Sequence, residues 1–120
     1  MVPRASAEVN HPLRHGIELF NRCAFFECHE ALEEIWAPER GPRRLFLQSL
    51  IHIAVAFYHV QRGNRLGAER QLRKGLKKLV GYLPECEGVC TEALYGEALD
   101  CLAQIRRGEE IEEFPKIRLR

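Results

Sequence analysis

One segment, Phe20 to Trp36, reads FNRCAFFECHEALEEIW and is the natural starting point for predicting the fold. No glycine or proline lies between Ala24 and Ala37, and residues that favour helices dominate the segment. We therefore predict a helix here, entered through a short turn at Cys23 and Ala24. The segment also concentrates one histidine and four glutamates, which makes it the first place to look for a functional site.

A helical wheel at about 100° per residue separates the charged side chains of this helix into two groups. Glu27, Glu30 and Glu34 fall opposite the apolar arc and are predicted to face water. His29 and Glu33 lie one turn apart at the edge of that arc and are predicted to border the core. The asymmetry points to His29 and Glu33 as the candidate functional pair of this helix.

Composition is that of one ordinary globular domain. The 120 residues suffice for a single core, and 46% hydrophobic with 29% charged residues is a common balance. A net charge of +1 provides no global field that would attract nucleic acid. The apolar run Leu45–Val60 is too short and too polar to span a bilayer, and residues 1–12 lack the apolar core of a signal peptide. We expect a cytoplasmic protein with neither nucleic acid nor membrane as a partner.

The five cysteines are an odd number and include no CxxC motif. Cys86 and Cys90 could form half of a zinc site, but no histidine or cysteine follows at zinc-finger spacing. A cytosolic chain keeps its thiols reduced. We therefore interpret all five as inert thiols, with a disulfide or a metal site as the alternatives.

Breaks at glycine and proline divide the chain into five predicted helices with no sheet, an all-α bundle. The predicted helices are 11–22, 25–37, 42–61, 65–82 and 91–107. Asn10 and Thr91 are the expected caps, and Gly108 the expected terminating glycine. We expect residues 1–9 to be flexible, residues 10–120 to form one helical domain, and residues 114–120 to form an extended tail. The first four helices form two helix-turn-helix hairpins of tetratricopeptide style.

The helix predicted at 42–61 carries a polar stripe on an otherwise apolar surface. Gln48, His52 and His59 fall within about 40° of one another on the wheel. A buried polar group without a partner costs about 1–3 kcal/mol, so the stripe must meet partners. We expect those partners to be His29 and Glu33. Three interpretations remain open, namely a satisfied interior network, a small-molecule or proton-transfer site, and a metal site that uses His29, Glu33 and His59.

Several further residues are predicted to have structural roles. Trp36, the only tryptophan, is expected to be largely buried against a later helix, and Asn64 to cap the helix that follows it. Gly67 and Ala68 are expected to allow close approach of two helices. The outer face of the helix predicted at 65–82 is basic, with Arg65, Arg70, Arg73, Lys74, Lys77 and Lys78. It lacks interleaved aromatic residues, so we interpret it as a solvated face rather than a nucleic-acid surface.

Three motifs in order resemble the DUF309 family of small, mainly prokaryotic helical proteins of unknown function. The motifs are Phe20-Asn21 with Phe25-Phe26-Glu27-x-His29-Glu30-x-Leu32-Glu33-x-x-Trp36, then Phe46-x-Gln48-x-Leu50-Ile51, then His59-x-x-x-Gly63-Asn64-x-x-Gly67-Ala68. The resemblance covers roughly residues 13–80 and implies a compact helical bundle. It also implies a shared polar cluster of Glu27, His29, Glu30, Glu33, Gln48, His59 and Asn64. His52 stands where the family more often has glutamine, and the resemblance implies no activity.

Two hypotheses about function follow, and the sequence leaves open whether the chain is an enzyme. The first is a small-molecule or metal-binding protein, with a divalent metal as one cofactor it could hold and hydrolysis as one reaction it could carry out. Its candidate ligands are Glu27, His29, Glu30, Glu33, Gln48, His52 and His59. The second is a non-catalytic protein-interaction module with a tetratricopeptide-like groove. The partner would accordingly be a small molecule or another protein.

Overall fold

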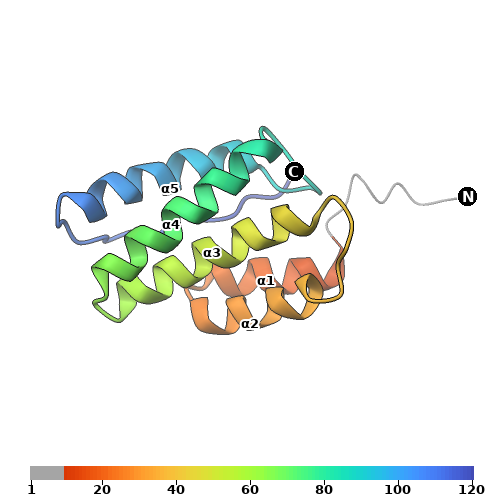
Figure 1. Ribbon diagram of the computed structural model, residues 1–120, viewed down its shortest axis with the longest axis horizontal. Coiled ribbons are helices and arrows are strands. Elements are labelled where there is room, and N and C mark those ends of the chain that lie inside the picture. Colours follow the sequence, from red (N-terminus) through yellow and green to blue (C-terminus); the bar gives the residue numbers. More distant parts are fainter. Residues whose placement is uncertain (1–9) are drawn as a thin grey trace, which may run out of the picture.

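The computed structural model describes residues 10–120, and the prediction of a flexible segment at residues 1–9 lies outside them. Within this range the chain forms an all-α fold of five α-helices and one short 3-10 turn, as predicted (Figure 1). The elements are α1 (His11–Asn21), α2 (Phe25–Trp36), α3 (Arg44–Gln61), α4 (Arg65–Leu79), η2 (Val80–Tyr82) and α5 (Thr91–Arg106). The only β-type pairing in this range is two isolated bridges, Cys86 with Val89 and Val89 with Leu119.

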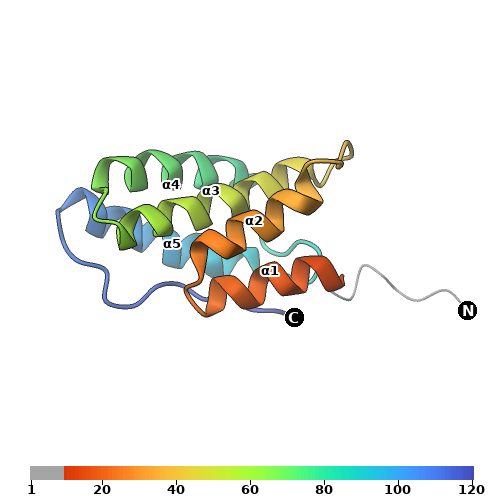
Figure 2. The same ribbon diagram turned by 90° about the horizontal axis from the view of Figure 1, so that it is seen from below.

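Each helix packs on the next one along the chain, so the fold is a sequential stack. Figure 1 shows α2, α3 and α4 side by side across the molecule. Figure 2 shows α1 and α5 on one side of that layer, with the chain after α5 running between them. None of the helices within residues 10–120 has both the length and the apolar character needed to cross a bilayer.

Local chemistry at the helix ends accounts for most boundaries. The side chain of Asn10 caps α1 by accepting a hydrogen bond from the backbone N–H of Leu13 at 3.0 Å. Cys23 adopts a positive φ of 62° in the α1–α2 turn, and Gly108 does the same after α5 with a φ of 74°. Thr91 differs from prediction, because it is the first helical residue rather than the cap. Its hydroxyl donates instead to the carbonyl oxygen of Tyr82 at 2.7 Å, which ties α5 to η2.

The core is centred on an aromatic cluster that joins four parts of the chain. Phe20 of α1, Phe25 of α2 and Phe57 of α3 are each fully buried or nearly so. Phe114, from the segment after α5, lies 5.1 Å from Phe25 and 5.3 Å from Phe57 between ring centroids. Such edge-on pairs stabilise a core beyond their buried area. Phe114 therefore anchors the C-terminal segment in the bundle.

The predicted tail is extended, and it fills the space between α1 and α5 (Figure 2). Two residues of the tail, Pro115 and Ile117, are buried. On one side the Asn21 side chain of α1 bonds to the backbone of Ile117, and on the other Arg118 pairs with Glu97 of α5. The tail is thus an integral part of the packed domain.

Helices α3 and α4 approach each other closely at Gly75. A Cβ at this position would lie 2.8 Å from Cγ1 of Ile53 and 3.0 Å from the carbonyl oxygen of Ser49. Ala68 is fully buried along the same helix. Gly67 has a different role from the predicted one, because its Cβ would collide with the side chain of Asn64 rather than with a neighbouring helix. Gly67 therefore leaves room for the cap of α4.

Candidate functional site

The exposed face of α2 agrees with the prediction except at Glu33, which is exposed to solvent rather than bordering the core. Glu27, Glu30 and Glu34 are exposed to solvent. Nε2 of His29 lies 3.3 Å from Oε1 of Glu33, one turn along the same helix, with side chains 24% and 48% exposed. This is a surface pair at the edge of the core, and exposed pairs of this kind contribute little to stability.

Aromatic rings connect this pair to α3. The Phe26 ring lies 5.7 Å from the His29 ring and 5.4 Å from the Tyr58 ring. The ring of Tyr58 lies 6.3 Å from the ring of His59, the next residue in the chain, between centroids. His29 therefore meets α3 through Phe26 and Tyr58 rather than through His59 itself.

His59 is directed toward the start of α4. Its Nδ1 lies 3.4 Å from Nδ2 of Asn64, a weak contact at this length. Asn64 is the N-cap of α4, as predicted, because its Oδ1 accepts a hydrogen bond from the backbone N–H of Gly67 at 3.0 Å. The imidazole of His59 thus belongs to the α3–α4 turn.

His52 makes the shortest side-chain hydrogen bond of the polar stripe. Its Nδ1 lies 2.7 Å from Oε1 of Gln71 on α4. Because an amide oxygen only accepts, Nδ1 of His52 carries the proton and Nε2 is left as the unprotonated nitrogen. Burial lowers the pKa of His52, and Lys78 and Lys74 lower it further, although the bond to Gln71 opposes the shift. The ring is therefore held in the neutral form with one defined tautomer.

The expected convergence of the stripe on His29 and Glu33 is therefore wrong. His52 and His59 both contact α4 or its cap, whereas Glu33 is the ion-pair partner of His29. Across residues 10–120, no three or more His, Cys, Asp or Glu side chains are grouped closely enough to hold a metal ion. The polar residues form separate pairs in place of one network. A wheel gives the direction of a side chain within its helix, but the packing of Gly75 decides which neighbour lies in that direction.

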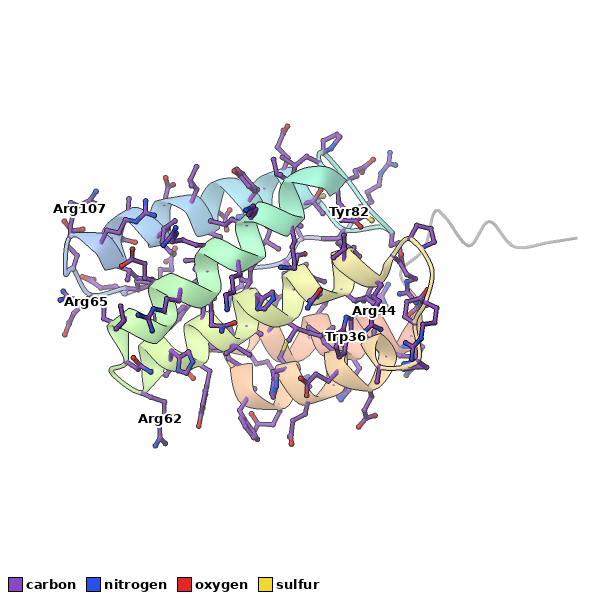
Figure 3. The ribbon with its side chains drawn as sticks, in the orientation of Figure 1. Trp36, Arg44, Arg62, Arg65, Tyr82 and Arg107 are labelled. Atoms are coloured by element: carbon purple, nitrogen blue, oxygen red, sulfur yellow. The ribbon has the colours of Figure 1, made fainter. Side chains whose placement is uncertain are left out.

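A groove lies between α3 and α4 at the end where α3 begins and η2 follows α4. Its volume is about 920 Å³. Tyr82 lies at this end of the molecule, opposite to Arg65 and Arg107 (Figure 3), and its hydroxyl donates to the carbonyl oxygen of Pro42 at 3.0 Å. We call this the α3–α4 groove, and its lining residues are Pro42, Leu45, Gln48, His52, Lys74, Lys77, Lys78, Val80, Gly81 and Tyr82.

The α3–α4 groove is cationic. Its lining includes three lysines and His52 but no carboxylate. Within residues 10–120, none of Lys74, Lys77 and Lys78 forms an ion pair with an acidic side chain. Sequence reasoning identified Gln48 and His52 as candidates but missed these lysines. The basic face of the helix was the available signal, and nothing in the spacing showed that it borders the polar stripe.

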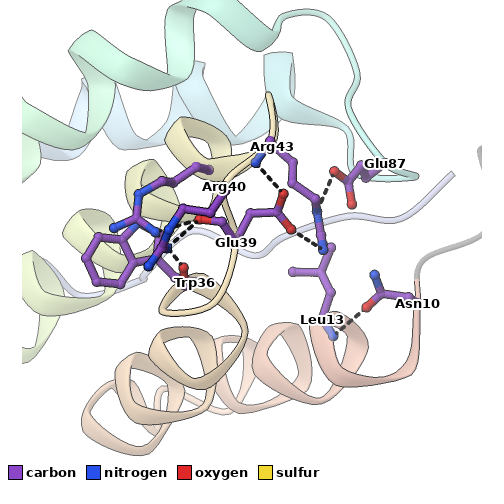
Figure 4. Close-up of polar contacts among 9 residues, drawn as sticks. Asn10, Leu13, Trp36, Glu39, Arg40, Arg43 and Glu87 are labelled. Carbon is purple, nitrogen blue, oxygen red and sulfur yellow. Dashed lines mark hydrogen bonds and ion pairs between the residues drawn. The ribbon is translucent and has the colours of Figure 1, made fainter.

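Trp36 packs against α3 but is only partly buried, which corrects the expectation that it is largely buried. The guanidinium of Arg44 lies 4.0 Å above the centroid of its ring, and the two side chains face each other in Figure 3. Nε1 of Trp36 is buried and has no hydrogen-bond partner within the described chain. The α2–α3 loop is fixed separately, since Nε of Arg43 lies 2.9 Å from Oε2 of Glu87 (Figure 4).

Three of the five cysteines have a raised thiol pKa. All five cysteines are free. Burial raises the pKa of the Cys28 thiol to about 12 and that of Cys101 to about 11, and it likewise raises that of Cys86 to about 11. A raised pKa removes the thiolate that acts as nucleophile or metal ligand.

Comparison with known proteins finds a family match in the N-terminal half of the described chain. Residues 13–71 match the model of a domain of unknown function, DUF309. A segment of 56 residues is 39% identical to the uncharacterized protein YpuF of Bacillus subtilis (strain 168), and it covers 46% of this chain but 32% of YpuF. The match spans α1 to the middle of α4 and includes Gln48, His52 and Gln71. The three lysines of the groove lie beyond it.

Proposed function

We propose, from the premise that residues 13–71 form a DUF309 domain, that this chain binds a small anionic molecule in the α3–α4 groove. The observation that carries the proposal is that three lysines and a histidine line one groove whose lining has no carboxylate. A volume of about 920 Å³ is in the range of small-molecule sites. A compact set of like charges destabilises a fold unless a counter-charge is supplied, and an anionic ligand would supply it.

The lining suggests how such a ligand would be held. Lysine ammonium groups donate charge-assisted hydrogen bonds to carboxylate or phosphate oxygens. The amide of Gln48 offers a further donor, and His52 offers one when its Nε2 is protonated. An anion beside Lys74 and Lys78 would favour that protonation. Binding should therefore tighten as the pH falls toward the pKa of His52.

Binding fits the lining better than hydrolysis or metal coordination. Metal coordination in the predicted form needs His29, Glu33 and His59 together, but His29 and Glu33 pair with each other while His59 contacts Asn64. Hydrolysis by a covalent route needs a nucleophile near a base. The lining has His52 as a base but neither serine nor cysteine. A ligand-binding role requires only the cations and the polar side chains that line the groove.

The alternative of a tetratricopeptide-like interaction module is less well supported. Such a module presents an open groove along its stacked helices. Here the space between α1 and α5 is filled by the tail, with Phe114 against Phe57 and Ile117 against Asn21. A partner on that side would first have to displace a segment that is part of the core.

The test is a titration with pyrophosphate and with citrate, followed by amide chemical shifts in NMR. We expect the shifts of Gln48, His52 and residues 74–82 to move with either anion. The double variant Lys74→Glu with Lys78→Glu should weaken binding by about tenfold or more, because two charge-assisted contacts become repulsive. Arg14→Glu changes an exposed cation on α1 and is the matched control. Shifts spread over the whole surface, or equal loss in the control, would contradict the proposal.

A further inference from the structure

The outward face of α4 carries a stripe that the groove does not explain. Alternating spacings of four and three residues place Leu66, Arg70, Arg73 and Lys77 on one face of α4, and Val80 of the adjoining η2 continues the same spacing. We call these five residues the α4 stripe. Its two ends are apolar and unusually exposed, with Leu66 58% and Val80 52% accessible to solvent. Its middle is cationic.

The cations of the stripe surround a hollow. Arg70, Arg73, Lys74 and Lys77 line a depression of about 300 Å³ on this face. None of these four side chains forms an ion pair or a side-chain hydrogen bond with another residue of the described range, 10–120. The nearest acidic residue of α4, Glu69, pairs with Arg106 of α5 instead. The hollow is thus a concentration of positive charge that no part of the described fold neutralises.

We propose that the α4 stripe docks the protein on the surface of an anionic lipid bilayer, with a lipid phosphate in the hollow. Leu66 and Val80 would enter the interfacial region at the two ends of the contact. The proposal goes beyond the groove ligand, because it uses the outward face of α4, although Lys74 and Lys77 border both sites.

The pattern of the stripe favours a bilayer among anionic partners. Surface helices that lie in a membrane interface combine exposed apolar residues with lysine and arginine. Residues 66–80 would extend about 21 Å along such a surface, with an apolar contact at each end and cations between. Single-stranded nucleic acid would need aromatic side chains for stacking, and the stripe has none. The sequence-based expectation of no membrane partner rested on the lack of a spanning segment, whereas surface docking needs only an exposed face.

The electrostatics of the rest of the molecule agree with an oriented contact. The exposed carboxylates Glu27, Glu30 and Glu34 lie on α2, which is separated from α4 by α3 (Figure 1). The net charge of +1 for the whole chain is therefore the sum of a basic face and an acidic face whose charges nearly cancel. An anionic surface would attract α4 and repel α2, which would turn the stripe toward the lipid.

The experiment is co-sedimentation of the full chain with vesicles of two compositions, phosphatidylcholine alone and phosphatidylcholine with about one third phosphatidylglycerol. We expect binding to the anionic vesicles only, with loss at high salt, because screening removes the attraction. Arg70→Glu with Lys77→Glu should reduce the bound fraction by about tenfold or more, since each cation near an anionic surface contributes to binding. Arg14→Glu with Arg22→Glu removes one exposed cation of α1 and one directly after it, and is the charge-matched control.

The apolar ends and the competing partners are tested in the same assay. Leu66→Ser with Val80→Ser keeps every charge and should weaken binding to anionic vesicles several-fold, with circular dichroism confirming that the variants are folded. Equal binding to both vesicle types, or no effect of reversing Arg70 and Lys77, would overturn the proposal. Binding of a duplex oligonucleotide with no binding to vesicles would assign the stripe to nucleic acid instead. Pyrophosphate binding without vesicle binding would leave the groove ligand standing and remove the bilayer proposal, whereas the reverse result would remove the groove ligand alone.

Discussion

The side chain of Asn21 forms two hydrogen bonds with the backbone of Ile117. Its Oδ1 accepts a hydrogen bond from the N–H of Ile117 at 2.7 Å, and its Nδ2 donates to the carbonyl oxygen of the same residue at 3.0 Å. The two residues are 96 positions apart in the sequence. This side chain at the end of α1 therefore holds the C-terminal tail in the bundle together with Phe114 and Arg118.

Replacing Asn21 with alanine should release this contact. Two backbone groups of Ile117 would lose their partners, and we expect unfolding free energy to fall by about 1–3 kcal/mol. Urea denaturation followed by circular dichroism measures the change. The adjacent variant Arg22→Ala alters an exposed side chain and should change stability by less than about 0.5 kcal/mol. Equal effects of the two changes would show that the tail does not depend on this contact.

Gly75→Ala should destabilise the fold although alanine is the better helix former. The new Cβ would lie 2.8 Å from Cγ1 of Ile53 and 3.2 Å from Cβ of His52, so α3 and α4 would have to move apart. We expect a loss of about 1–3 kcal/mol. Gly96→Ala is the matched control, because a Cβ on this glycine of α5 would meet nothing within 4 Å. It should gain about 0.5–1 kcal/mol from helix propensity, and thermal melts of both variants would reveal the opposite signs.

Trp36 offers a test of an unpartnered donor. Trp36→Ala removes the ring beneath Arg44 and should cost less than about 3 kcal/mol, because the side chain is only partly buried. Trp36→Phe keeps an apolar ring in that position and removes the buried Nε1 that has no partner. We expect its cost to stay below about 1 kcal/mol, since loss of an unsatisfied donor offsets the weaker contact. If phenylalanine proved as costly as alanine in chemical denaturation, Nε1 would have to be hydrogen-bonded in solution.

Stability should depend on pH through His52. Burial and the nearby lysines lower its pKa in the folded state below the ordinary value of 6.5, so the unfolded chain takes up the proton first as the pH falls. The contribution of His52 to stability is therefore complete above that value and declines as the pH drops from it toward the folded-state pKa. Urea denaturation across this window should show the decline, and His52→Gln should flatten it. A steeper decline in the variant would contradict the assignment.

Much of the fold was predictable because it depends on neighbours in the sequence. The capping by Asn10 and Asn64, the termination at Gly108 and the exposure of Glu27, Glu30 and Glu34 all follow from contacts within a turn or two of helix. Thr91 was misassigned as a cap because its hydroxyl has a competing partner nine residues away, the carbonyl oxygen of Tyr82. Local chemistry accounts for the elements, and it fails where a distant group competes.

The candidate site depends even more on contacts between segments that are distant in the sequence. The polar stripe of Gln48, His52 and His59 could be read from spacing, but spacing could not show that it faces α4. In the structure α3 and α4 approach closely at Gly75, Gln71 lies 2.7 Å from His52, and Lys74 and Lys78 line the groove beside it.

The amino-acid sequence alone therefore determined the five helices, the caps at Asn10 and Asn64, the apolar faces and the polar residues that each helix carries. Only the tertiary structure decided which helix lies opposite each polar residue, and that Asn21 meets Ile117 and Phe114 meets Phe25. Helix formation is governed by hydrogen bonds and side-chain contacts over three or four residues, which a linear pattern records. The pairing of distant segments is governed by shape and packing over the whole core, where even one added methyl group, as at Gly75, would collide with the neighbouring helix.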